Sequence, residues 1–180
     1  HELVGAILAL QHVDFAGVVG YQAFVAYTAL NSVTLRGTQL HTIAGHAFYH
    51  VTTLRKVVLP PTLRVIGQCA FCGCSSLTDI VLPDGLQQIQ DSAFLKSGLT
   101  SITLPSSIVH IATRAFGMSR LERIEFKKPS SLFQLDDYAF HANATLNGTV
   151  ELPASLQQIG YDVFKNCHCE TIRVPTTLAR

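Results

Sequence analysis

The feature that most constrains the fold of this chain is a short sequence unit that recurs about every 23 residues. The dipeptide Ala-Phe, replaced by Val-Phe in the last copy, recurs at steps of 24, 23, 23, 22, 24 and 24 residues. A unit of this length is too short to enclose a hydrophobic core, so it must bury its apolar side chains against neighbouring copies. The sequence therefore predicts a solenoid, a stack of similar coils. The copies are Ala23-Phe24, Ala47-Phe48, Ala70-Phe71, Ala93-Phe94, Ala115-Phe116, Ala139-Phe140 and Val163-Phe164.

Two further sequence features recur with the same spacing as this dipeptide. Each copy has an apolar-x-apolar triplet such as Ile102 and Leu104, followed by proline in five of the seven copies. Period-two alternation is typical of a strand whose apolar side chains point inward, and proline ends a strand because it has no N–H to donate. An apolar residue about four positions before each Ala, such as Ile66, should open a turn followed by a short helix or 3₁₀ turn. We expect one parallel β-sheet and one buried Phe spine over seven to eight coils.

The complete unit reads Leu-x-x-Ile-x-Leu-Pro-x-x-Leu-x-x-Ile-Gly-x-x-Ala-Phe-x-x-Cys. Residues 66–74 and 159–167 match its last part, with Cys74 and Cys167 at the Cys position. This pattern resembles the BspA-like class of leucine-rich repeats over about residues 18–178. The resemblance implies an α/β repeat solenoid, a right-handed leucine-rich-repeat coil. It also implies a non-enzymatic scaffold that presents a curved repeat surface to proteins, of cell-surface or secreted, adhesin-like type.

The repeat divides the chain into three parts of a single solenoid. Residues 1–29 form an irregular N-terminal coil, residues 30–168 the regular repeats, and residues 169–180 an incomplete C-terminal repeat. In the first coil, Leu8 and Leu10 are the expected strand triplet. Because the sequence opens with His1 and not Met, we expect a processed product or part of a longer chain. Neither end carries the polar outer face that caps an exposed solenoid end.

Charge and hydropathy narrow the functional classes. Thirteen basic and twelve acidic residues give a net charge of +1, which excludes an electrostatically driven nucleic-acid binder. The longest apolar run, residues 3–10, is too short for a membrane span, which needs about 20 residues. Charged residues are only 14% of the chain and the mean hydropathy is +0.30, which suggests surface hidden by neighbours. This favours an alternative function as a structural accessory subunit of a large multiprotein assembly, peripherally associated with a membrane.

The cysteines are the residues most suited to bind a metal ion. Cys74 and Cys167 occupy the same repeat position four coils apart, which places them roughly 19 Å from each other at about 4.8 Å per coil. Zinc ligands lie within about 4 Å of each other, and Cys69, Cys72 and Cys74 lack a fourth ligand. Nor do the scattered histidines form a catalytic arrangement. We therefore expect repeat cysteines in or near the core, and no enzyme, catalytic residue, cofactor or metal.

Strand geometry predicts which residues face a partner. If Ile102 and Leu104 point inward, Ser101 and Thr103 point outward. Applied to every coil, this rule gives an exposed ladder, and solenoids use such extended surfaces for binding. Its mixture of apolar, hydroxyl and charged side chains suits a protein or peptide better than a polyanion. The candidate partner-binding residues are Lys56, Val58, Asp79, Val81, Ser101, Thr103, Arg123, Glu125, Thr149, Glu151 and Arg173.

Two N-glycosylation sequons, beginning at Asn143 and Asn147, lie where one repeat is lengthened. Extra residues in a solenoid usually bulge outward, where a glycan could be accommodated; a bulge without a role is the alternative. Use of either site would favour an extracellular or cell-surface location, against an organellar complex as the other possibility. The identity of the protein partner does not follow from the sequence.

Overall fold

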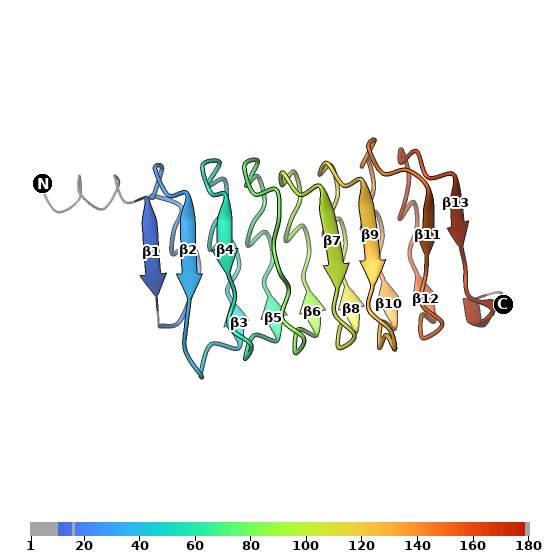
Figure 1. Ribbon diagram of the computed structural model, residues 1–180, viewed down its shortest axis with the longest axis horizontal. Helices are drawn as coiled ribbons and strands as arrows, with labels where there is room; N and C mark the ends of the chain where they lie inside the picture. The colour runs from blue at the N-terminus through green and yellow to red at the C-terminus, as the bar shows by residue number, and fades with distance from the viewer. Residues whose placement is uncertain (1–10, 16, 179–180) are drawn as a thin grey trace, which may run out of the picture.

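The computed structural model describes residues 11–15 and 17–178 as coils stacked along one axis (Figure 1). Strands run along two sides of the stack, and every strand pairs in parallel with its neighbours. We call the two sides the ladder side and the back sheet. Corresponding repeat positions lie opposite one another, as with Ile102 and Ile124 on the ladder side or Ile66 and Ile89 on the back sheet. Residues at equivalent positions of the sequence repeat are therefore paired with each other in neighbouring strands.

The strands alternate between the two sides along the chain, except that β1 and β2 follow each other on the ladder side and β5 and β6 on the back sheet. The ladder side carries β1 (His12–Phe15), β2 (Ser32–Leu35), β4 (Lys56–Val58), β7 (Ser101–Leu104), β9 (Arg123–Phe126), β11 (Thr149–Glu151) and β13 (Thr171–Arg173). The back sheet carries β3 (Thr42–Ile43), β5 (Val65–Ile66), β6 (Gln88–Ile89), β8 (His110–Ile111), β10 (Gln134–Leu135) and β12 (Gln158–Ile159). A single 3₁₀ turn, η1 (Thr176–Leu178), follows β13 at the end of the described chain.

The expected fold class is confirmed: the chain is a solenoid of parallel strands with a central row of Phe rings. The coil count is lower than expected, since the six-stranded back sheet marks about six turns and not seven to eight. The back sheet itself was not predicted, because the segments around Ile66 and its counterparts were expected only to begin turns.

The Ala-Phe segments form hydrogen-bonded turns and not the helical or 3₁₀ turns expected from the sequence. The reason is a left-handed residue just before each dipeptide, because a residue with positive φ cannot continue a right-handed helix. These residues have φ between 53° and 60°. They are Gln22, His46, Cys69, Ser92, Arg114, Tyr138 and Asp162.

The ladder side is not one continuous sheet. Its strands form three hydrogen-bonded groups, β1–β2–β4, β7–β9 and β11–β13. No strand forms at residues 79–82, yet Ile80 and Leu82 are buried there as the alternation predicts. On its N-terminal side β2 pairs with β1, with Val13 opposite Val33. Leu8 and Leu10, the predicted strand residues, lie outside the described residues.

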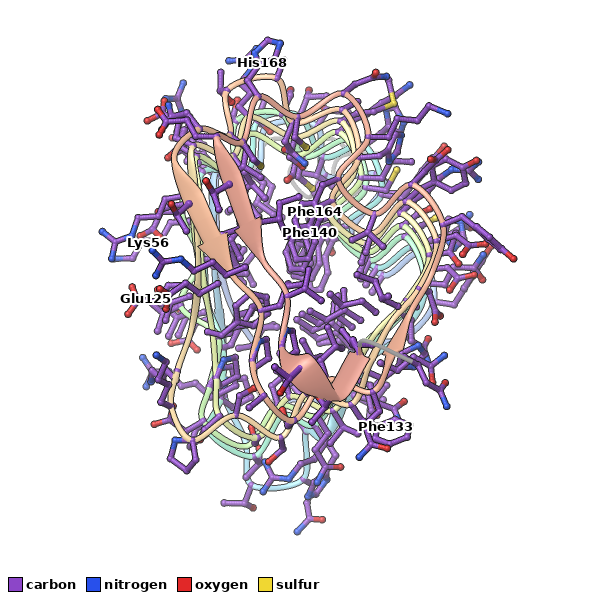
Figure 2. The ribbon with its side chains drawn as sticks, turned by 90° about the vertical axis from the view of Figure 1, so that its right-hand side faces the viewer. Lys56, Glu125, Phe133, Phe140, Phe164 and His168 are labelled. Carbon is purple, nitrogen blue, oxygen red and sulfur yellow. The ribbon has the colours of Figure 1, made fainter. Side chains whose placement is uncertain are left out.

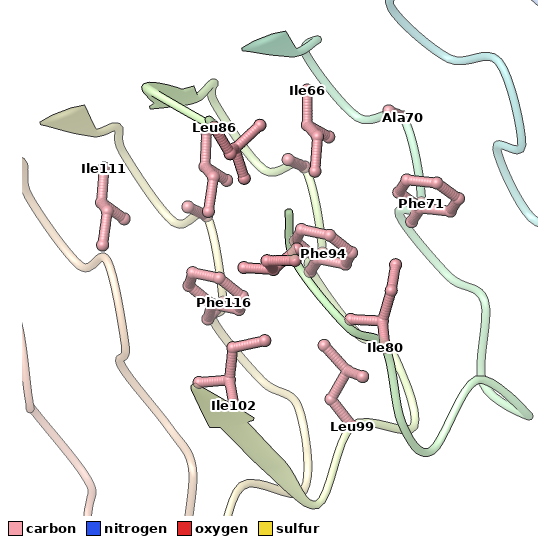
Figure 3. Close-up of a cluster of buried hydrophobic side chains, with 14 of the residues drawn as sticks. Ile66, Ala70, Phe71, Ile80, Leu86, Phe94, Leu99, Ile102, Ile111 and Phe116 are labelled. Atoms are coloured by element: carbon pink, nitrogen blue, oxygen red, sulfur yellow. The ribbon is translucent and has the colours of Figure 1, made fainter. Parts of the chain in front are cut away.

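The Phe rings form the predicted spine through the centre of the stack. Consecutive rings from Phe24 to Phe164 lie 4.6–5.5 Å apart between centroids, with planes within 7° of parallel. Figure 2 looks along the stack, with Phe140 and Phe164 at its centre, and Figure 3 shows Phe71, Phe94 and Phe116 in a row. From Ala47 to Ala139 the alanines before the Phe residues are buried, and their carbonyls approach the preceding coil closely: Phe71 N–H donates to the Ala93 carbonyl at 2.7 Å. The small side chain permits that approach.

A column of polar side chains, three positions after the Phe, ties adjacent coils together. Each of these side chains donates a hydrogen bond to the main-chain carbonyl of the Phe one coil earlier. Buried carbonyls need such partners, since an unpaired buried polar group is costly. The bonds are Cys74 Sγ to Phe48 O at 3.1 Å, Ser119 Oγ to Phe94 O at 3.0 Å, Asn143 Nδ2 to Phe116 O at 2.9 Å and Cys167 Sγ to Phe140 O at 3.2 Å.

Candidate partner-binding surface

The ladder side presents one row of outward side chains in each coil. In β7, Ser101 and Thr103 are exposed while Ile102 and Leu104 are buried, and β9 repeats this alternation. Figure 2 shows Lys56 and Glu125 projecting from this side, away from the spine and opposite Phe133. All eleven candidate residues are exposed. They are Lys56, Val58, Asp79, Val81, Ser101, Thr103, Arg123, Glu125, Thr149, Glu151 and Arg173.

The N-terminal half of the ladder has an apolar strip. Val58 is 41% exposed and Val81 is 77% exposed. Both occupy the same repeat position in consecutive coils, flanked by the charged side chains of Lys56 and Asp79 two residues earlier in the sequence. An apolar centre with polar neighbours is the arrangement found in protein interfaces.

The C-terminal half of the ladder is charged but internally paired. Arg123 Nη2 lies 2.9 Å from Glu125 Oε2, and Arg173 Nη1 lies 2.8 Å from Glu151 Oε1, while Lys128 Nζ approaches Glu151 at 3.6 Å. These side chains are at least half exposed, so each pair contributes at most about 1 kcal/mol to stability. Acidic and basic side chains are therefore interspersed in this half of the ladder.

A shallow pocket of about 420 Å³ opens where the ladder side breaks between β9 and β11. Its apolar lining residues are the buried Ile124, Leu146 and Val150, and its polar lining residues are Glu122, Arg123, Asn147 and Thr149. The repeat pattern did not predict this pocket. The one signal in the sequence is the irregular spacing of this repeat, which separates two strands that otherwise would pair.

The structure contradicts the prediction that Asn143 is a glycosylation site. Asn143 is 0% exposed. Its Nδ2 donates to the carbonyls of Phe116 at 2.9 Å and Phe140 at 2.7 Å, and its Oδ1 accepts from Leu121 N–H at 3.2 Å. The amide therefore belongs to the polar column between coils and has no room for a glycan. Asn147 is exposed and stays a predicted site.

Replacing Asn143 with alanine should lower the free energy of unfolding by about 2 kcal/mol, because two carbonyls and one N–H lose a buried partner. Asn147→Ala is the matched control four residues away, where an exposed change is expected to stay within about 0.5 kcal/mol. Urea unfolding followed by circular dichroism measures both. Equal losses for the two variants would contradict the role assigned to the Asn143 amide.

The described residues contain no group of three or more His, Cys, Asp or Glu side chains placed to hold a metal ion. The five cysteines are free thiols, and Cys169 packs partly buried against the core, as its repeat position predicted. On the back sheet, His110 Nε2 pairs with Asp136 Oδ2 at 2.8 Å, and Gln134 donates to the other carboxylate oxygen at 2.6 Å. This network joins adjacent coils.

In the part of the chain that the structure covers, no helix has the length and apolarity to cross a membrane.

Comparison with known proteins finds the same repeat. The family model described as BspA type leucine rich repeat region matches six copies, over residues 17–147 and 117–180. A leucine-rich repeat protein from Bacteroides ovatus ATCC 8483 has 24% identity and a TM-score of 0.81 over 93% of this chain and 47% of its own. A leucine-rich cell surface protein from Faecalibacterium prausnitzii A2-165 has 23% identity and a TM-score of 0.73 over 91% of this chain and 47% of its own.

A T. pallidum leucine-rich repeat protein has 29% identity and a TM-score of 0.55 over 80% of this chain and 58% of its own. The chain thus spans about half the length of the solved structures it matches. No curated protein matches the chain. At these identities, the likeness to the Bacteroides and Faecalibacterium structures describes the fold alone.

Proposed function

The chain belongs to the BspA type leucine-rich repeat family, and on that premise we propose that it is a non-enzymatic protein-interaction scaffold of cell-surface or secreted, adhesin-like type. Leucine-rich repeat proteins typically bind other proteins, and members of the family are generally scaffolds without catalytic activity. The observation that carries the proposal is the ladder: outward side chains from six successive coils, from Lys56 to Arg173, are exposed on one side of a stacked frame. A rigid frame limits the entropy lost on binding, which favours affinity.

The chemistry of the ladder describes the partner. Val58 and Val81 are the apolar anchors, and a protein surface with an apolar patch would cover them. Ser101 and Thr103 offer hydroxyl groups for hydrogen bonds in the next coil. The paired charges of the C-terminal half determine where the partner lies along the ladder more than how tightly it binds. The partner we propose is a protein, with no nucleic acid and no cofactor.

Photo-crosslinking tests this proposal. A benzophenone amino acid is placed at Val81 on the ladder or at Gln88 on the back sheet; both residues are exposed and lie in the same coil. In cells that make the protein, the Val81 probe should capture one protein reproducibly, and the Gln88 probe should not. Capture of the same protein from Gln88 alone would place the binding surface on the back sheet and overturn the proposal.

The second candidate function is a structural accessory subunit of a larger assembly. It is favoured by the low share of charged residues, 14%, and the mean hydropathy of +0.30, which suggest surface covered by neighbouring subunits. Stoichiometric migration with a large complex after gentle extraction would support this function. A free protein with a glycan at Asn147 would support the surface or secreted one.

A further inference from the structure

The turn of the third repeat contains two thiols in a fixed arrangement. Cys69 and Cys72 stand at the first and fourth positions of a turn closed by a hydrogen bond from Cys72 N–H to the Cys69 carbonyl at 3.1 Å. Each thiol influences the pKa of the other. Ala70 and Phe71, between them, are fully buried in the stack and hold the turn in place. The ends of such a turn lie within about 7 Å between Cα atoms, and a disulfide needs about 4.4–6.8 Å.

Cys74 and Cys167 differ from this pair. Cys74 and Cys167 each donate to the main-chain carbonyl of a Phe one coil earlier. Oxidation of either thiol would remove this hydrogen bond between coils. Among the described residues, neither Cys69 nor Cys72 makes such an inter-coil bond through its sulfur, so their oxidation breaks no inter-coil hydrogen bond of this kind. Cys69 is partly exposed and gives a reagent access to the pair, whereas Cys72 is buried.

We propose that Cys69 and Cys72 form a reversible disulfide by exchange with a low-molecular-weight disulfide such as oxidised glutathione. The Cys69 thiolate attacks one glutathione sulfur, breaks the S–S bond and releases one glutathione thiolate. The Cys72 thiolate then attacks Cys69 in the mixed disulfide and releases the second glutathione thiolate. Two protein thiols are oxidised and one glutathione disulfide is reduced to two thiols, which take up the two protons that the cysteines lose.

The exchange with oxidised glutathione should be measured at mildly alkaline pH, because both cysteines hold their protons at neutral pH. Burial raises the pKa of the Cys69 thiol and raises the pKa of Cys72 to about 11. The thiolate, which is the attacking form, is therefore scarce at neutral pH for both residues.

The experiment uses the whole folded chain, incubated with oxidised or reduced glutathione, then alkylated with a maleimide and digested for mass spectrometry. After oxidation, we expect three of the five thiols to be alkylated and one peptide to contain a Cys69–Cys72 disulfide, which reduced glutathione reverses. Five alkylated thiols, or a disulfide that includes Cys74, Cys167 or Cys169, would overturn the proposal.

Two variants separate the steps of the exchange. Cys72→Ser should retain one glutathione on Cys69, because the second displacement cannot occur. Cys69→Ser should leave the buried Cys72 without an adduct. An adduct on Cys72 in the second variant would contradict the order of attack, and if either variant fails to fold, the peptide map of the unchanged chain still decides whether the disulfide forms.

Discussion

Replacing Phe94 with alanine is expected to lower the free energy of unfolding by about 3–5 kcal/mol, the usual range for a fully buried Phe. Phe94 is buried at the middle of the spine and stacks on both Phe71 and Phe116 at 5.2 Å. Coils in a solenoid contact only their neighbours, so a cavity here weakens the connection between the two halves of the stack. Denaturant unfolding followed by circular dichroism gives the loss.

Phe164→Ala is the control for this prediction. Phe164 is only partly buried and has one ring neighbour, Phe140 at 5.5 Å. We expect less than half the loss found for Phe94→Ala. If Phe164→Ala costs as much or more, the spine is not the main contribution to the stability of the middle coils.

Replacing Gly67 with alanine is expected to destabilise the chain by about 3 kcal/mol, the upper part of the usual range for overpacking. A Cβ on Gly67 would lie 2.6 Å from the Ile43 carbonyl oxygen, 2.8 Å from the Gly45 nitrogen and 2.9 Å from the Ala44 carbonyl carbon. These are main-chain atoms of the preceding coil, so they cannot move aside without separating two coils. The same separation would break the bond from Gly67 N–H to Ile43 O at 2.8 Å.

Gly20→Ala is the matched control because Gly20 has the same repeat position. Among the described residues, a Cβ on Gly20 meets no atom within 4 Å. The substitution should be neutral or stabilise the chain by about 0.4–1 kcal/mol, since alanine restricts the unfolded chain. Unfolding midpoints of the two variants measure the difference, and equal midpoints would show that the close approach of coils at Gly67 does not constrain its side chain.

The ladder could be predicted from the sequence because side-chain alternation depends on extended backbone and not on strand pairing. Ile80 and Leu82 face the core although residues 79–82 form no strand. The back sheet could not be predicted in this way, because two-residue strands such as β6 are too short to leave a period-two pattern. The left-handed turns also gave no signal, since Arg114 and Tyr138 are not residues that favour positive φ.

The error at Asn143 has a physical cause. A sequon is a local motif, whereas burial is decided by the position of a residue in the coil. Asn143 stands three residues after Phe140, where Cys74 and Cys167 stand after their own Phe. Aligning the lengthened repeat on its Phe would have placed Asn143 inside. Asn147 lies beyond that column and is exposed.

The most direct test of the binding role of the ladder compares two charge-substituted variants of the chain. The quantity measured is the affinity of each variant for the protein that cross-linking captures. Val81→Asp places a charge on the apolar strip of the ladder, and Gln88→Asp places the same charge on the back sheet of the same coil. We expect Val81→Asp to weaken binding at least tenfold, about 1.4 kcal/mol, and Gln88→Asp to leave it unchanged. Unchanged binding by Val81→Asp together with weakened binding by Gln88→Asp would contradict the account.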